Sequence, residues 1–347
     1  MMLKDTNRLK FVPQTVEAFP MWNYYPVSDV RPSQLFLRQI ENCGRVCWKS
    51  EGKQTSESAK PFAFGIIKKR HFSVTEFGTL DVTLPKEKLD AVGGPHCCRF
   101  TRIVPDDNKQ TITIATSLRE LLVWTEQQEP NNVSYRNLFW LVTSGELGEH
   151  CSSETLLEWL LDDIDANFES KYMIKPNTAQ LMAASKENPT LTVISPIRVL
   201  VKCVTSRSVT HELVRHRLFS FLQESQRYCR YKGKLTLIDP VTQYEEFGYS
   251  DENLINFFER AAETYDYLLG KGMSPQKARI VLPNQTKTEI YALGFYDYIA
   301  SWVAAQRCSK HADPAMRRLY CIATQVVEMT LVNHIELGVV ASDKQDS

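Results

Sequence analysis

The chain of 347 residues is long enough for one large domain or two smaller ones, and 43% hydrophobic with 10% aromatic residues suffices for a buried core. Lysine plus arginine and aspartate plus glutamate each number 41, so the formal net charge is zero, which argues against a protein that holds nucleic acid on a broadly basic surface. The nine cysteines form no C-x-x-C pair, which favours a reducing compartment over a disulfide framework or a zinc knuckle. The sequence shows no signal pattern and no apolar run of ~18 residues, so we expect a soluble, cytoplasmic protein.

The first 85 residues combine an aromatic, proline-rich start with helical and strand patterns. Residues 1–29 have no helical period, and we expect an irregular arm that lies on the core. Apolar stripes predict helices over about 33–43 and 56–69. The alternation in residues 79–84 predicts a half-buried strand that ends at Pro85.

Residues 86–194 differ in sequence pattern from the segments on either side, and we interpret them as an insertion or subdomain. Turn clusters lie at 93–95 and 105–108, and the second separates two β-prone runs at 99–104 and 111–115. Helical patterns follow at 117–126 and 153–167, and a polar linker covers 185–189.

From residue 191 the periodic patterns strengthen. A strand is predicted through 197–201, followed by a helix that begins near Ser206 and continues into an arginine-rich segment. Further helices are predicted over 251–270, from Ser274-Pro275 to Pro283, after a capping box at Thr286-x-x-Glu289, and from Asp313-Pro314 onward. The whole pattern predicts an α+β fold with a mixed or antiparallel sheet flanked by helices.

The arginine-rich segment, residues 215–227, reads Arg215-His216-Arg217, then seven residues, then Ser225-Gln226-Arg227. Guanidinium groups are permanently charged and fit phosphate oxygens, and a serine hydroxyl with backbone N–H groups can complete a phosphate cradle. A solvated basic face or a helix that contacts a nucleic-acid backbone are the alternatives. The apolar residues between the two triplets favour a segment drawn into the core, where arginines require partners.

The dipeptide His211-Glu212 resembles the start of a zinc-protease motif. That motif needs a second histidine at i+4, and here this position is Arg215. His216 stands at i+5, roughly 140° off the required face of a helix. We therefore predict no metal site.

The pattern R-H-R-x7-S-x-R resembles the signature of the flavin-dependent thymidylate synthases. Three other segments resemble elements of that family: His71-x-Ser73-x-x-Glu76 before a strand, residues 278–290, and residues 307–311. The resemblance covers about residues 30–85 and 195–335, which it implies to be the core, with 86–194 as an insertion and 1–29 as the arm.

The resemblance implies reductive methylation of dUMP to dTMP. FAD would be the redox cofactor, NADPH the electron source and methylenetetrahydrofolate the one-carbon donor. It also implies a homotetramer whose sites lie between subunits. The zero net charge argues against a nucleic-acid partner, and the lack of a long apolar run argues against a membrane partner. The sequence has no glycine-rich dinucleotide fingerprint, so FAD would be bound without a Rossmann fold.

The resemblance also implies a role for each matching residue. Arg307 is the expected catalytic residue, because a fixed guanidinium near the uracil would stabilise negative charge as N3 ionises. The residues expected to bind dUMP are Glu212, Arg215, Gln223, Ser225, Gln226, Arg227 and Arg279, and those expected to hold FAD are His71, Ser73, Glu76, Arg215, His216 and Arg217.

The sequence departs from the family pattern at three places. Glu212 stands where glutamine is frequent, Gln223 stands where the family has an acidic residue, and residues 293–298 lack the asparagine and arginine that touch the flavin in the family. One alternative is therefore a nucleotide-binding relative that has lost the chemistry. A nucleic-acid binder that uses the arginine helix is another, and it would show strongly salt-dependent affinity.

Two residues have a sequence context that could suggest a catalytic nucleophile. Cys229 stands between two arginines, as a low-pKa thiol would, but we interpret it as structural. Ser225 has no visible general base, so we interpret it as a phosphate ligand.

Overall fold

The computed structural model describes residues 3–19, 21, 30–95, 98–148, 150–173, 196–244, 252–296, 298 and 307–342. Within these residues the chain forms three sheets surrounded by helices, so the predicted α+β class is confirmed. The sheets include one parallel pair and otherwise antiparallel pairs. No helix in the described ranges is both long and apolar enough to cross a bilayer.

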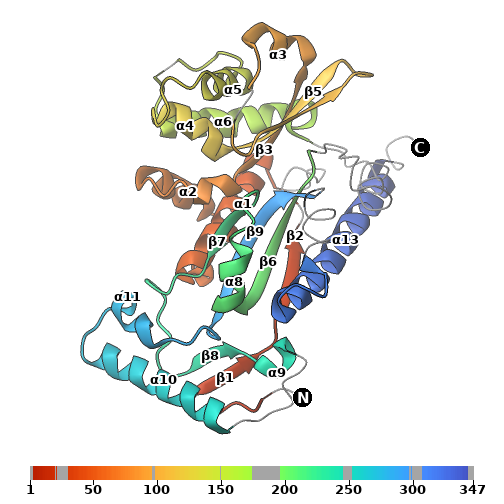
Figure 1. Cartoon of the computed structure of the whole chain (residues 1–347). Coiled ribbons are helices and arrows are strands. Elements are labelled where there is room, and N and C mark those ends of the chain that lie inside the picture. The colour runs from red at the N-terminus through yellow and green to blue at the C-terminus, as the bar shows by residue number, and fades with distance from the viewer. Residues whose placement is uncertain are drawn as a thin grey trace.

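A four-stranded antiparallel sheet forms the middle of the molecule (Figure 1). Its strand order is β2 (Thr15–Phe19), β6 (Arg198–Ser206), β9 (Lys287–Phe295) and β7 (Ser220–Gln223). Helix α8 (Arg207–Leu213) follows β6 directly, and the Ser206 hydroxyl accepts a hydrogen bond from the N–H of Val209, as an N-cap does. Helix α13 (Pro314–Ser342) packs against β2 and β6.

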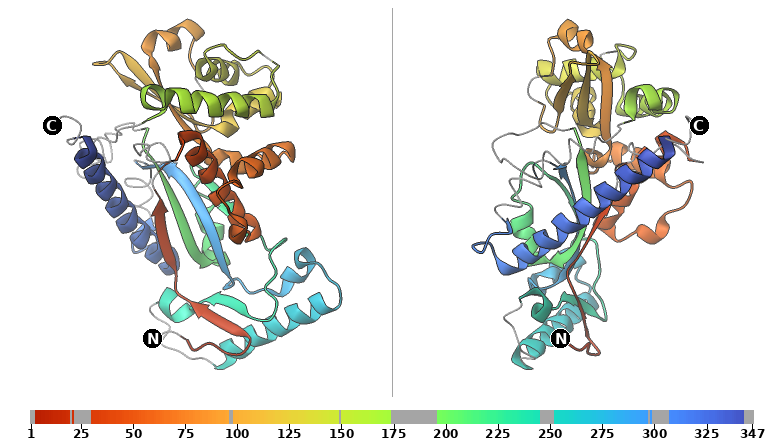
Figure 2. Two further views of the ribbon diagram at one scale, coloured as in Figure 1. Left: turned by 180° about the vertical axis from the view of Figure 1, so that it is seen from behind. Right: turned by 90° about the vertical axis from the view of Figure 1, so that its right-hand side faces the viewer.

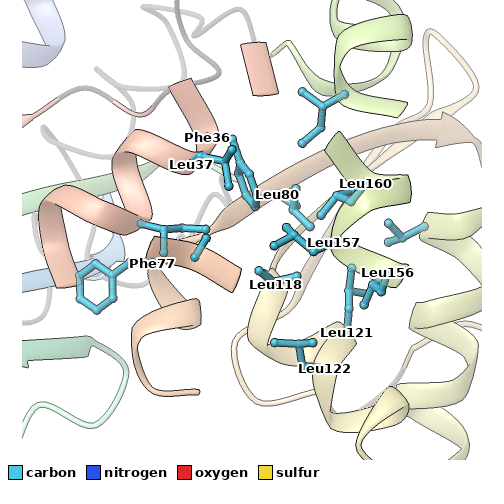
Figure 3. Packing of buried hydrophobic residues seen from close by; sticks show 14 of the residues in the cluster. Phe36, Leu37, Phe77, Leu80, Leu118, Leu121, Leu122, Leu156, Leu157 and Leu160 are labelled. Carbon is cyan, nitrogen blue, oxygen red and sulfur yellow. The ribbon is translucent and has the colours of Figure 1, made fainter. Parts of the chain in front are cut away.

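The upper part of the molecule in Figure 1 is built on the antiparallel sheet β3–β5–β4. One hydrophobic core joins its strands to the helices around it and to the middle sheet through Leu200, Leu222, Tyr291 and Leu293, and Figure 3 shows part of its packing. The Asp165 carboxylate accepts hydrogen bonds from the N–H and hydroxyl of Ser33, which ties the start of α1 to α6. The elements of this part are α1 (Pro32–Arg45), the short 3-10 helices η2 (Val46–Trp48) and η3 (Glu51–Lys53), α2 (Ala59–Lys68), η4 (Val74–Phe77), β3 (Thr79–Pro85), α3 (Lys86–Val92), β4 (Arg102–Asp106), β5 (Thr111–Ser117), α4 (Leu118–Thr125), α5 (Val133–Thr143), α6 (Ser153–Asn167) and the π-helical turn η5 (Phe168–Tyr172).

The lower part combines a parallel strand pair with a long helix. Strand β1 (Leu9–Val12) pairs with β8 (Leu235–Ile238), and α10 (Glu252–Gly270) covers them, as both Figure 1 and Figure 2 show. Helices α9 (Pro240–Gln243) and α11 (Pro275–Ala278) and the 3-10 turn η6 (Arg279–Val281) complete this part.

Most predicted helices and strands are present, but three expectations are wrong. The arm is not irregular over residues 9–19, because β1 and β2 pair there with β8 and β6, far along the chain. The predicted helix through the arginine-rich segment ends at Leu213, and residues 220–223 form strand β7. The predicted capping box does not begin a helix, because residues 287–295 form β9. The remainder of the arm and the linker at 185–189 lie largely outside the described residues.

The capping box does not form because the Glu289 side chain bonds to lysines instead of to the backbone N–H at the start of a helix. Glu289 is buried, and its carboxylate bonds to Lys49, at 2.7 Å, to Lys202, at 2.9 Å, and to Lys287. Burial opposes the charge of Glu289, but the three lysines outweigh it and lower the pKa to about 2. The aromatic and aliphatic residues that follow then alternate across the sheet rather than around a helix.

Glycine is required at position 294 of β9. A Cβ atom there would lie 2.5 Å from the ring of Phe219, which is closer than real contacts allow. This close approach brings the turn before β7 against the middle sheet, and His216 stands three residues before Phe219 in that turn.

Candidate functional site

The C-terminal end of β7 borders a pocket of about 460 Å³ that collects residues from four separate segments of the chain. The segment after β7 is held in place by backbone bonds, because the N–H of Glu224 donates to the carbonyl of Glu289 and that of Ser225 donates to the carbonyl of Cys47. The pocket is lined by Cys47, Trp48, Arg70, His71, Phe72, Ser73, Val74, Arg119, Leu222, Gln223, Ser225, Arg227 and Tyr228.

His71 reaches this pocket because α2 ends sharply just before it. Arg70 adopts a left-handed conformation with φ of 57°, and the N–H of His71 bonds back to the carbonyl of Ile66. The imidazole then stacks on the indole of Trp48, with ring centroids 5.9 Å apart and planes 14° apart. Tyr228 lies 6.3 Å from Trp48 on the opposite segment, so aromatic rings border the pocket from both segments.

Gln223, Ser225 and Arg227 follow one another at the end of β7. The Gln223 amide donates to the hydroxyl of Thr210, at 2.8 Å, and to that of Thr288, at 3.2 Å, which fixes the amide orientation. The Ser225 hydroxyl accepts from the N–H of Arg227, and the Arg227 guanidinium lies over the ring of Tyr228 at 5.1 Å. Arg227 is exposed, so its charge is available to an anion in the pocket.

A second cluster brings Arg307 together with Glu212 and His216. The Nε of Arg307 donates to Nε2 of His216 at 3.0 Å, and its NH1 lies 3.4 Å from a carboxylate oxygen of Glu212. Since Nε2 accepts, the imidazole is neutral and carries its proton on Nδ1. Burial, and then the charge of Arg307, lower the pKa of His216 to about 4. The guanidinium of Arg307 therefore has a fixed orientation.

The low pKa of His216 makes stability depend on pH. The ordinary histidine pKa is 6.5, so between pH 6.5 and 4 His216 is protonated in the unfolded chain but stays neutral in the folded chain. We expect a stabilisation of up to about 3 kcal/mol that is present above pH 6.5 and is lost as the pH falls toward 4. Urea unfolding at a series of pH values measures it, and His216→Asn should flatten the slope while His311→Asn, at an exposed position, leaves it unchanged. An equal slope in the His216 variant would contradict this assignment.

The structure distributes the predicted site residues over several places. His71, Ser73, Gln223, Ser225 and Arg227 line the pocket at the end of β7, and Glu212, His216 and Arg307 form the second cluster. The remaining residues line neither: Arg215, Arg217 and Arg279 are exposed, and Glu76 and Gln226 are half-buried. Their predicted roles stay predictions.

Sequence reasoning did not single out Trp48, Tyr228, Arg119 and Glu120. The guanidinium of Arg119 lies 5.0 Å over the ring of Phe72, which lines the pocket beside His71. Glu120 is buried, and burial followed by the nearby charge of Glu76 raises its pKa to about 7. A carboxylate inside the apolar face of the 117–126 helix was the one signal in the sequence that could have indicated Glu120.

Comparison with known proteins gives one family. Residues 164–330 match the family described as thymidylate synthase complementing protein. The chain is 37% identical over 133 residues to flavin-dependent thymidylate synthases of Mycobacterium tuberculosis (strain H37Rv) and Mycobacterium bovis, and 35% identical over 127 residues to that of Mycobacterium avium. Each alignment covers 33% of this chain and 50% of the relative, so the chain spans about half the length of the curated relatives it matches.

Solved structures of a UMP/dUMP methylase, PolB from Streptomyces cacaoi, also align with the chain. The complex with 5-Br dUMP is 20% identical with a TM-score of 0.29, and the alignment covers 37% of this chain and 67% of that one. The complex with 5-Br UMP is 22% identical with a TM-score of 0.31, and covers 38% and 69%.

The predicted resemblance to the flavin-dependent thymidylate synthase family is thereby confirmed for residues 164–330. This segment includes the arginine-rich segment and Arg307. His71 and Ser73 lie outside it, and the fold alone brings them to the same pocket as Ser225.

Proposed function

We propose that this protein is a methyltransferase that converts dUMP to dTMP, with FAD as redox cofactor, NADPH as reductant and methylenetetrahydrofolate as one-carbon donor. The observation that carries the proposal is the convergence of two separate motifs, His71-x-Ser73 and Ser225-x-Arg227, on one pocket. These motifs lie more than a hundred residues apart in the sequence, so the fold brings them together and their spacing along the chain does not.

The residues around this pocket suit a nucleotide and a planar cofactor. Ser225 and Arg227 would hold the phosphate of dUMP beside Gln223. The further expected ligands do not line the pocket in the single chain: Gln226, Arg279, Glu212 and Arg215. His71 and Ser73 would contact FAD beside the indole of Trp48, and planar aromatic side chains fit the face of a flavin. Glu76, Arg215, His216 and Arg217 would complete the FAD site. When bound, the flavin supplies the redox chemistry that reductive methylation requires.

Arg307 would act on the pyrimidine. Its guanidinium is fixed by His216 and Glu212, and a fixed cation in a site shielded from water lowers the energy of the negative charge that develops when N3 of the uracil ionises. A neutral His216 accepts from this guanidinium without competing for its charge. The protein's own contribution is therefore to bind, orient and ionise the nucleotide.

The sites would be shared between subunits of a cytoplasmic homotetramer with the fold of this family. Arg279 and its neighbour Ile280, which is 77% exposed, point to solvent in the single chain and are available to a second copy. Light scattering on the purified protein tests the tetramer directly.

A thiolate mechanism has little support from the surroundings of Cys229. The thiol is buried, and burial first and the Glu224 carboxylate second raise its pKa to about 11. We expect Cys229→Ala to retain turnover within about threefold, because no step needs the sulfur. Steady-state dTMP formation measures this, and an inactive but folded variant would restore the cysteine as a nucleophile.

One experiment tests the whole proposal. The protein is incubated with FAD, NADPH, methylenetetrahydrofolate and dUMP, and dTMP is measured by chromatography, with dUMP omitted from the control. Formation of dTMP supports the proposal. Protein that is colourless, gains no yellow absorbance with FAD and forms no dTMP would instead indicate a nucleotide-binding relative without the chemistry.

A further inference from the structure

A second pocket, which we call the Lys287 pocket, adjoins the candidate site and shares Trp48 and Tyr228 with it. Its volume is about 500 Å³. Among the described residues, five cationic side chains line it and Glu224 is the one carboxylate in the lining. The cations are Lys49, Arg230, Lys232, Lys234 and Lys287.

Three of these cations are already neutralised by the protein. Lys49 and Lys287 bond to Glu289, Lys287 also lies 3.1 Å from Glu224, and Lys234 lies 3.2 Å from Asp5. Arg230 and Lys232 are exposed, and within the described residues neither has a carboxylate partner. The pocket therefore keeps two charges that an anionic ligand can neutralise.

The walls of the Lys287 pocket also offer aromatic surface. Tyr228 is 52% exposed, and Trp48 is partly exposed and lies between this pocket and the candidate site. A planar base can lie against such rings, since every nucleobase has a π-face. Arginine in addition presents a planar fork that grips a phosphate in a bidentate manner, and lysine provides a point charge.

We propose that the Lys287 pocket binds the phosphate-bearing adenosine end of the reducing nicotinamide nucleotide, with Arg230 and Lys232 as the residues that recognise its 2′-phosphate. This inference rests on the proposed function, which supplies the reductant. The shared wall of Trp48 and Tyr228 allows one extended molecule to lie in both pockets, so the nicotinamide end would reach the candidate site. The 2′-phosphate is the group that distinguishes NADPH from NADH, and unpartnered cations select for it.

The test uses adenosine 2′,5′-bisphosphate as a probe, because it carries the anionic end without the redox group. Isothermal titration measures its affinity for the wild-type protein, for Arg230→Gln/Lys232→Gln and for Lys88→Gln, an exposed lysine on α3 outside both pockets. We expect the double variant to bind at least about tenfold more weakly and the Lys88 variant to bind as the wild type does. In turnover, the double variant should raise KM for NADPH but not for NADH or dUMP.

Other outcomes would overturn the proposal. Unchanged probe affinity in the double variant, or an equal loss in Lys88→Gln, means that the pocket does not recognise the phosphate. Selective loss of affinity for a polyglutamylated folate assigns the pocket to the other co-substrate, and selective loss of salt-dependent oligonucleotide binding assigns it to nucleic acid. Because the titration needs no turnover, probe binding that depends on Arg230 and Lys232 without any dTMP formation would refute the proposed reaction and leave a phosphate pocket.

Discussion

Arg307→Ala should slow dTMP formation at least about a hundredfold and leave FAD bound. The guanidinium would supply the charge that stabilises the ionised pyrimidine, and removing one such donor costs about 10²–10³-fold in rate. Loss of the side chain removes its bonds to His216 and Glu212 but no side chain that lines the pocket at the end of β7. Single-turnover dTMP formation and the flavin absorbance of the purified variant are the two measurements.

Two matched variants sharpen this result. Lys310→Ala removes an exposed cation from the same turn and should keep full activity, whereas Arg307→Lys keeps the charge but loses the planar fork and should recover only part of it. If the flavin is lost together with activity in Arg307→Ala, this arginine holds the cofactor and another residue acts on the pyrimidine.

The same substitution should change the titration of His216. Burial is the larger cause of its low pKa and Arg307 the second, so removing the cation should raise the pKa above about 4 without restoring 6.5. Two-dimensional NMR of the imidazole measures the shift. A pKa that does not move would show that the contact between the two side chains does not form in solution.

The sequence predicted those helices and strands whose residue pattern can be recognised within the segment itself. The helices α1, α6 and α10 carry apolar stripes, and β3 alternates, so their positions follow from the pattern of residues alone. Strands β1, β2 and β9 depend on partners far away in the chain, and no local pattern reveals those partners. The capping box at Thr286-x-x-Glu289 was misleading because Glu289 pairs with residues that are distant in the sequence. Its lysine partners come from the end of η2, from β6 and from β9.

Some residues of the candidate site could likewise be predicted from the sequence, and others could not. Chemistry-bearing residues could be selected by their type and spacing, and His71 and Ser225 do meet. The aromatic wall could not be predicted, because Trp48 has no motif and reaches the pocket only through the turn after α1. A helix from near Ser206 into the arginine-rich segment was expected, whereas a turn and strand β7 separate Arg227 at the pocket from Arg215 and Arg217 in solvent.

The second large effect concerns the ion pair between Asp81 on β3 and Arg198 on β6. The two side chains are 0% and 5% exposed and 2.6 Å apart, and Arg198 also donates to the carbonyl of Thr116. The pair joins the upper sheet to the middle sheet. Asp81→Ala removes the carboxylate that bonds to this buried guanidinium, and we expect the free energy of unfolding to fall by about 3–5 kcal/mol. Urea denaturation followed by tryptophan fluorescence measures the loss.

A comparison of variants separates the penalty of an unpaired charge from the value of the pair. Asp107→Ala removes a carboxylate that is 75% exposed and pairs with Lys86, and it should change stability by less than about 1 kcal/mol. The double variant Asp81→Leu/Arg198→Met replaces the buried pair by apolar groups, and it should recover most of the stability because no charge stays buried alone. If the double variant is as unstable as Asp81→Ala, the pair itself holds the two sheets together, and its bond to the carbonyl of Thr116 cannot be replaced by packing.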